Sequence, residues 1–156
     1  VFVTSTLTNG DIGGVSGGDA ICSARASAAG HGGMFVAWLT IPTAQSPYDR
    51  IQGKGPWILP GGPSVFLERS SIIDGGPLVP LEHDENGDLL VSVEVWTGTR
   101  QDGSVDTNTS QCSDWLSANS GVEGSIGNGE DITWTELSFL SCNELARLIC
   151  FETVSE

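Results

Sequence analysis

Hydrophobic and polar residues alternate over the first few positions of the chain. Residues 1–6 are rich in Val, Phe and Thr, a composition that is typical of a strand. A glycine-rich stretch follows, after which the pattern predicts a helix over residues 20–29 with Asp19 as its N-cap. Gly30 is placed to end this helix, because glycine is common just past a helix C-terminus. The apolar run at residues 34–41 then predicts a second strand.

Regular periodicity is lost between residues 42 and 81. All seven prolines of the chain fall between positions 42 and 80. Short apolar stretches at residues 57–59 and 65–67 predict two short strands within this segment. An irregular segment of this length is uncommon in a compact domain unless it carries a function. We therefore expect it to pack on the core and to contribute to binding.

Short elements continue in the second half of the chain. An Asn-Gly pair within residues 85–88 predicts a hairpin turn, and residues 89–96 then predict a strand. Residues 113–120 predict a short helix. The alternation at residues 132–137 and the apolar run at residues 147–153 predict two more strands.

Length and charge narrow the class of protein. The chain has 156 residues, enough for one domain over residues 1–156, and its mixture of short strands with one or two helices indicates the fold class α+β. It has no run of 18 apolar residues, so no membrane insertion is expected. A net charge of −14 opposes binding to nucleic acid, anionic membranes and sulfated glycosaminoglycans. The acidity has three interpretations, namely solubility, calcium ligation and the steering of a basic protein partner.

Four cysteines divide the chain into an outer and an inner pair. Cys22 and Cys150 lie near the two ends, and Cys112 and Cys142 lie between them. A nested pairing would tie the two ends together, but four cysteines allow three connectivities and spacing alone does not choose among them. Disulfides form in oxidising compartments, so we expect an extracellular or cell-surface location.

Three blocks of sequence together resemble a known family. They are residues 13–39, residues 95–115 and residues 141–152, the last reading Ser-Cys-Asn-Glu-Leu-Ala-Arg-Leu-Ile-Cys-Phe-Glu. In order and spacing they resemble the endostatin domain of collagens XV and XVIII, and more closely the bacterial endostatin-like outer-surface proteins of Leptospira. The resemblance implies a C-type-lectin-like fold and the disulfides Cys22–Cys150 and Cys112–Cys142.

The chain also departs from that family in the residues that bind ligands. Endostatin holds zinc through histidines near its N-terminus, whereas this chain has only His31 and His83. Endostatin binds heparin through clustered arginines, whereas the five arginines here are scattered, so heparin binding is not expected. The Glu-Pro-Asn, Gln-Pro-Asp and Trp-Asn-Asp motifs of sugar-binding C-type lectins do not occur. Trp134-Thr135-Glu136 lies near the expected place of the last motif.

Acidic loops offer candidate cation sites. Asp84, Asn86 and Asp88 place oxygen-bearing side chains at alternating positions, which calcium accepts, although the spacing is not that of an EF-hand. The alternative is a solvated hairpin turn. The same two interpretations apply to the loop with Asp102, Asp106 and Asp114 and to the acidic loop at residues 127–131.

Catalysis has no clear candidate residues. Glycine-flanked His31 has two interpretations, a ligand or base and a simple turn residue. The chain contains no nucleophile elbow, HExxH sequence or phosphate-binding loop, so an enzyme is not expected.

The tryptophans provide one candidate ligand contact. Trp38, Trp96 and Trp134 lie in strand-like runs and are expected in the core, and Trp115 is expected to pack on the inner disulfide. Trp57 lies in the irregular segment, where it is either an exposed anchor for a ligand or buried under the loop.

The resulting hypothesis is a secreted or surface-exposed, non-enzymatic binding or adhesion domain. The resemblance implies an extracellular-matrix or other host protein as its partner. Contacts are expected from residues 42–80, 84–88 and 102–114. One alternative is a carbohydrate-binding module that uses Trp57 without calcium. Another is a structural interaction module of a larger extracellular protein.

Overall fold

A computed structural model gives the structure of the protein and describes residues 1–41 and 45–154. The predicted α+β class is confirmed, since short helices accompany three small antiparallel sheets and two disulfides. The first sheet has the order β1-β8-β2 and the third has the order β5-β6-β7, whereas the second is the β3–β4 hairpin. The strands are β1 Phe2–Val3, β2 Met34–Ala37, β3 Trp57–Ile58, β4 Ser64–Phe66, β5 Glu94–Trp96, β6 Glu123–Asn128, β7 Ser138–Ser141 and β8 Ile149–Thr153. The helices are α1 Gly14–Ala28, α2 Pro47–Arg50 and α3 Gln111–Trp115, with the 3₁₀ turn η1 at Arg69–Ile72.

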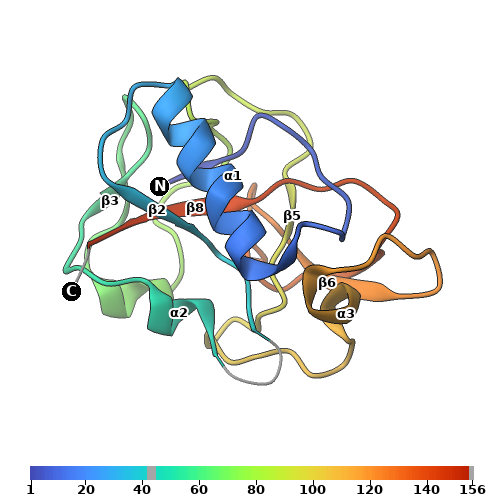
Figure 1. Ribbon diagram of the computed structural model, residues 1–156. Coiled ribbons are helices and arrows are strands. Elements are labelled where there is room, and N and C mark those ends of the chain that lie inside the picture. Colours follow the sequence, from blue (N-terminus) through green and yellow to red (C-terminus); the bar gives the residue numbers. More distant parts are fainter. Residues whose placement is uncertain (42–44, 155–156) are drawn as a thin grey trace.

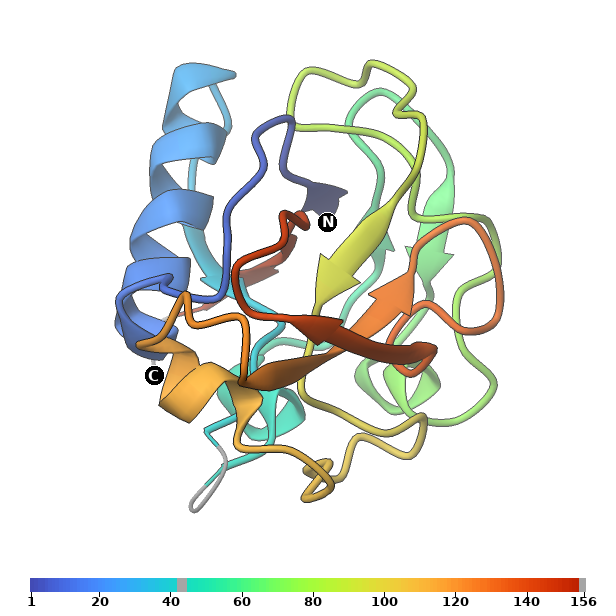
Figure 2. The same ribbon diagram turned by 90° about the vertical axis from the view of Figure 1, so that its right-hand side faces the viewer.

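The first sheet brings the two ends of the described chain together. β8 lies between β1 and β2, with Phe2 opposite Cys150 and Phe35 opposite Glu152. Helix α1 lies across β2 and β8 and forms one side of the molecule (Figures 1 and 2). Among the described residues, no helix has the length and apolar character needed to cross a bilayer.

Helix α1 begins earlier than the sequence predicts. Its first residue is Gly14, so Asp19 lies inside the helix and the N-cap prediction is wrong. The Asp19 carboxylate instead accepts a hydrogen bond from the backbone nitrogen of Ala37 (2.9 Å) and pairs with Arg50 (2.5 Å), which ties the helix to β2 and α2. The predicted end is confirmed, because Gly30 has φ 79° directly after the helix C-cap.

Close packing explains why a glycine-rich segment is helical. The buried residues of α1 are Gly18, Cys22 and Ala26, which share one face at a spacing of four. A Cβ atom at Gly18 would lie 2.7 Å from Leu39 Cδ1 and 3.1 Å from the Ala37 Cβ. The helix therefore packs so closely here that a methyl group at Gly18 would press on the buried side chains of Ala37 and Leu39.

We expect Gly18→Ala to destabilise the protein, although alanine is the better helix former. The added methyl group overpacks the helix–strand contact, which typically costs about 1–3 kcal/mol and exceeds the propensity gain of about 1 kcal/mol. Urea unfolding measures the difference. Gly32→Ala is the control, because a Cβ atom at Gly32 meets nothing within 4 Å. A Gly18→Ala variant as stable as the control would contradict the packing argument.

Three predictions in the second half need correction. The strand predicted at residues 89–96 is reduced to β5, and residues 132–137 form turns, so that strand prediction is wrong. The helix predicted at residues 113–120 is instead the five-residue turn α3.

All five residues of α3 have positive φ values between 50° and 63°, so this turn is left-handed. Its conformation is costly for residues other than glycine, and the disulfide at Cys112 and buried side chains on either side hold it in place.

Two buried clusters form the core. In the first, five aromatic rings pack around β8; they belong to Trp38, Trp57, Phe66, Trp134 and Phe151. The second lies under α1 and contains both disulfides, Cys22–Cys150 and Cys112–Cys142, which is the pairing that the resemblance implies. The core positions predicted for Trp38, Trp96 and Trp134 are confirmed. Trp115 lies in the same cluster as the inner disulfide.

Candidate functional site

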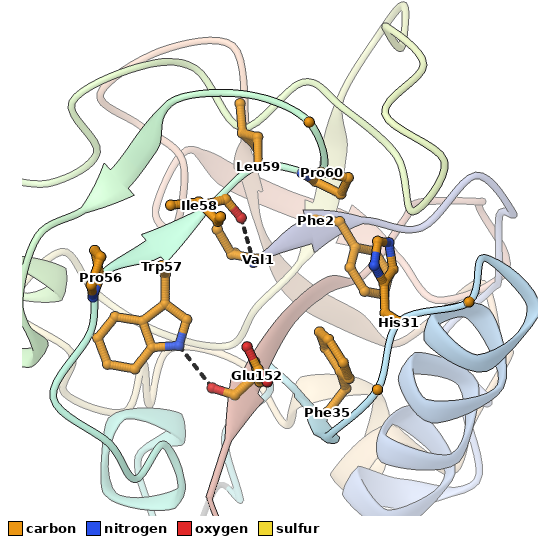
Figure 3. Close-up of a pocket in the computed structure, with 13 residues that line it drawn as sticks. Val1, Phe2, His31, Phe35, Pro56, Trp57, Ile58, Leu59, Pro60 and Glu152 are labelled. Atoms are coloured by element: carbon orange, nitrogen blue, oxygen red, sulfur yellow. Dashed lines mark hydrogen bonds between the residues drawn. The ribbon is translucent and has the colours of Figure 1, made fainter.

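A cleft of about 360 Å³ opens between the β3 segment and the end of α1. Its walls come from Pro56–Gly61, from β1, from the glycine-rich connection between α1 and β2, and from Glu152 near the end of β8 (Figure 3). The backbone nitrogen of Val1 donates a hydrogen bond to the Ile58 carbonyl oxygen (2.9 Å), which joins β1 to the β3 wall. Segments far apart in sequence therefore form one concave surface.

Sheet register places the aromatic side chains of one wall together. Because Phe2 and Phe35 lie on the two strands that flank β8, their rings come within 5.4 Å of each other between centroids. The His31 imidazole lies 6.1 Å from the Phe2 ring and is stacked on it. The three rings form an aromatic wall opposite Ile58 (Figure 3).

Trp57 lines the cleft but is not an exposed anchor. Its side chain is only 5% exposed, so of its two interpretations the buried one is confirmed and the exposed anchor is not. The indole nitrogen donates to the backbone oxygen of Glu152 (2.7 Å), and the ring packs edge-on against Phe151. Burial of a large aromatic ring in the core cluster is favourable, and the indole N–H is satisfied by the backbone oxygen.

His31 connects the helix end to the acidic turn. Its Nε2 atom lies 2.6 Å from the Glu85 backbone oxygen, and since a carbonyl oxygen only accepts, Nε2 carries the hydrogen. The Glu85 carboxylate in turn is buried, accepts hydrogen bonds from Ser5 and lies 3.5 Å from Arg25. The contacts of this histidine therefore hold two loops together at the cleft rim.

The calcium candidate at Asp84, Asn86 and Asp88 is a compact turn. Asp84 is buried, and its Oδ1 atom accepts hydrogen bonds from the backbone nitrogens of Asn86 (2.8 Å) and Asp88 (3.0 Å). Asn86 and Asp88 are exposed, so the three side chains do not converge on one point. Within residues 1–41 and 45–154, no group of three or more His, Cys, Asp or Glu side chains is placed to hold a metal ion.

Carboxylates of the other two acidic loops accept hydrogen bonds from the protein itself. They are Asp102 and Asp106 in the second loop and Asp131 in the third. Asp106 is buried and accepts from Ser125 Oγ (2.8 Å). Hydrogen bonds from Ser104 lower the pKa of Asp102, and hydrogen bonds from Thr133 lower the pKa of Asp131. Asp114 is exposed on α3. The structure thus does not bring Asp102, Asp106 and Asp114 into one cation site.

Comparison with known proteins gives no relative. No family model matches the chain, and no curated protein matches it. The endostatin-like resemblance therefore stays a prediction that rests on the three sequence blocks.

All five arginines contact groups of the protein itself. Arg25, Arg50 and Arg100 lie within 4 Å of the carboxylates of Glu85, Asp19 and Asp106. Arg69 and Arg147 donate to backbone oxygens. Most of the acidic side chains within the described part of the chain thus have no arginine partner, and the net charge of −14 makes the surface field negative.

Sequence reasoning missed most of the residues that form the cleft. Phe2, Phe35 and Ile58 were assigned only to strands, and the side of each strand that faces the cleft depends on pairing with β8. The predicted contact segment 42–80 does contribute the wall Pro56–Gly61. Residues 42–44 of that segment lie outside the described residues.

Proposed function

We propose that the protein is a non-enzymatic, extracellular binding domain of the C-type-lectin-like, endostatin-like type, and that it recognises a protein partner through the cleft. The observation that carries the proposal is the cleft itself, in which Phe2, His31, Phe35 and Ile58 lie beside the exposed carboxylate of Glu152. A concave surface that combines apolar side chains with a charged group is typical of a binding site.

The charge distribution favours a partner with basic residues. Glu152 is the only carboxylate among the described residues of the cleft, and the surrounding surface is acidic. A lysine or arginine of the partner pairs with Glu152 while an apolar side chain contacts Ile58 and the rings. The family resemblance adds that the partner is an extracellular-matrix or other host protein.

The carbohydrate alternative is less well supported by these contacts. Calcium-free sugar binding usually needs an exposed aromatic face, and Trp57 was the residue proposed to supply it. Its ring is buried against Phe151, so this face is not available. The alternative of a structural module with a neighbouring domain as partner uses the same cleft, and the test below includes it.

Ile58→Asp is expected to weaken partner binding by about tenfold or more. The side chain is 51% exposed at the cleft, and loss of its burial at an interface removes about 1.5–3 kcal/mol. The oxidised protein is first screened against matrix proteins and glycans in calcium and in EDTA, and the variant is then titrated against the protein hits.

Leu67→Asp is the matched control for this experiment. Leu67 is 59% exposed on the same hairpin but does not line the cleft, so its replacement should leave binding unchanged. Equal losses in both variants would contradict a role for the cleft. Hits limited to glycans would contradict a protein partner, and a silent array would favour the structural module.

A further inference from the structure

A groove with mainly apolar walls lies away from the cleft, around Trp134. It consists of two adjoining cavities of about 420 and 190 Å³ that share Pro77 and Ile132. Its walls come from the segment after η1, from the turn at residues 101–102 and from the loop between β6 and β7. The groove and the cleft have no lining residue in common.

The indole nitrogen of Trp134 distinguishes this groove. The other four tryptophans each donate Nε1–H to an oxygen of the protein at 2.7–2.9 Å. Trp134 is only 2% exposed, yet its Nε1 atom donates to no acceptor among the described residues, and this nitrogen is not one of the fully buried atoms that lack a partner there, His83 Nδ1 and Arg147 Nε. A Cβ atom built on Gly76, which lines the groove, would lie 3.7 Å from this nitrogen. The N–H edge of the indole is therefore at the groove wall, where a ligand oxygen can accept from it.

The aliphatic walls favour a protein segment over a sugar. Leu78 and Ile132 are both exposed, and Ile132 is 80% exposed although it is a large aliphatic residue. Together with Pro77 and Pro80 they form an apolar strip along the groove. Sugars stack on exposed aromatic faces, and the only ring lining this groove among the described residues, that of Trp134, is buried. An aliphatic or proline side chain of a partner fits such a strip.

The charges at the groove indicate which charge the partner carries. Asp102 lines the larger cavity and Asp131 the smaller one, whereas no lysine or arginine of the described chain lines either. Hydrogen bonds from Ser104 and Thr133 lower the pKa of these two carboxyl groups, so both are ionised at neutral pH. A basic side chain next to an apolar one is the complement of this arrangement.

We propose that the Trp134 groove binds an extended segment of a protein partner that combines an aliphatic or proline residue with a lysine or arginine. A backbone carbonyl of the segment accepts the hydrogen bond from Trp134 Nε1, its apolar side chain lies on Pro77 and Ile132, and its basic side chain pairs with Asp102 or Asp131. The proposal rests on the proposed protein-binding function but not on the cleft.

The test uses the oxidised full chain labelled with ¹⁵N and a panel of six-residue peptides. Each peptide contains Pro-Leu or Leu-Pro followed by Lys or Arg, and each has a counterpart with Glu in place of the basic residue. The indole N–H signal of Trp134, assigned with Trp134→Phe, is expected to shift on addition of the basic peptides and to stay in place with the acidic ones. Absence of any shift with the basic peptides, or a shift caused only by oligosaccharides, would overturn the proposal.

Ile132→Asp and Val91→Asp form the matched pair of variants. Val91 is 81% exposed, as Ile132 is, but it lies outside the groove. Ile132→Asp is expected to weaken binding of the basic peptides at least fivefold, whereas Val91→Asp leaves it unchanged; equal losses would overturn the assignment. Ile58→Asp in the cleft should leave the Trp134 shift intact, so failure of the groove and failure of the cleft are distinguishable.

Discussion

Replacing Cys22 and Cys150 together by alanine is expected to lower the free energy of unfolding by on the order of 5 kcal/mol. The bond joins α1 to β8 across a sequence separation of 128 residues, and a cross-link over so long a loop removes much of the entropy of the unfolded chain. A loss of this size is a large part of the stability of a typical domain. The variant is therefore expected to be partly unfolded at 37 °C, which thermal unfolding followed by circular dichroism measures.

The inner disulfide provides the comparison. Cys112 and Cys142 are 30 residues apart, so the same loop argument gives a smaller loss of on the order of 3.7 kcal/mol for their double replacement by alanine. Both pairs are fully buried, so the loss of sulfur packing is similar in the two variants. If the inner replacement proved more damaging than the outer one, loop entropy would not be the main contribution.

The outer disulfide also anchors the strand beside which the candidate cleft forms. It ties β8 to α1, and the cleft residues Phe2 and Phe35 lie on β1 and β2, the two strands that pair with β8. The cysteines and the strands at both ends were evident from the sequence. Their pairing came from the resemblance, because spacing alone left three connectivities open.

Long-range packing explains where the sequence-based predictions were wrong. The sequence predicts a helix over residues 20–29, after an N-cap at Asp19, because the preceding glycines are typical of turns, yet Gly18 lies inside the helix and is buried against Leu39. The strand β6 was not predicted at all. It contains Gly124 and Gly127, and a Cβ atom at Gly127 would lie 2.0 Å from the Trp134 backbone oxygen. Propensity does not register contacts of this kind, since they depend on how separate elements pack against each other.

The candidate sites show the same limit. Trp57 could be located in the irregular segment, but its burial depends on Phe151 at the far end of the chain. Trp134 was correctly assigned to the core, yet its free indole N–H depends on the positions of Gly76 and the groove walls. Side-chain exposure and hydrogen-bond partners therefore had to come from the structure.

Phe151→Ala is expected to cost about 3–5 kcal/mol, the usual loss for removing a buried phenylalanine. The ring is fully buried in β8, and its centroid lies 5.4 Å from that of Trp38 and 5.6 Å from that of Phe66. Two further tryptophans, Trp57 and Trp134, contact it at 6.2 and 6.4 Å. The surrounding rings are large and tightly held, so the cavity is expected to collapse only partly. Urea unfolding measures the loss in free energy of unfolding, and the m-value should stay equal to that of the unchanged protein.

Two further variants test whether the loss of stability comes from packing in the aromatic cluster. They are Phe139→Ala, which truncates an exposed phenylalanine, and Phe151→Leu, which keeps most of the buried volume. Phe139 is exposed on β7, so its truncation should cost less than about 1 kcal/mol, whereas Phe151→Leu retains much of the volume and should cost about 1–2 kcal/mol. Similar losses for Phe139→Ala and Phe151→Ala would contradict the packing argument.

Because Phe151 contacts both Trp57 in the cleft wall and Trp134 in the groove wall, one buried ring supports both proposed binding surfaces. The rigidity of either surface thus depends on the same core residue, although the surfaces share no lining residue.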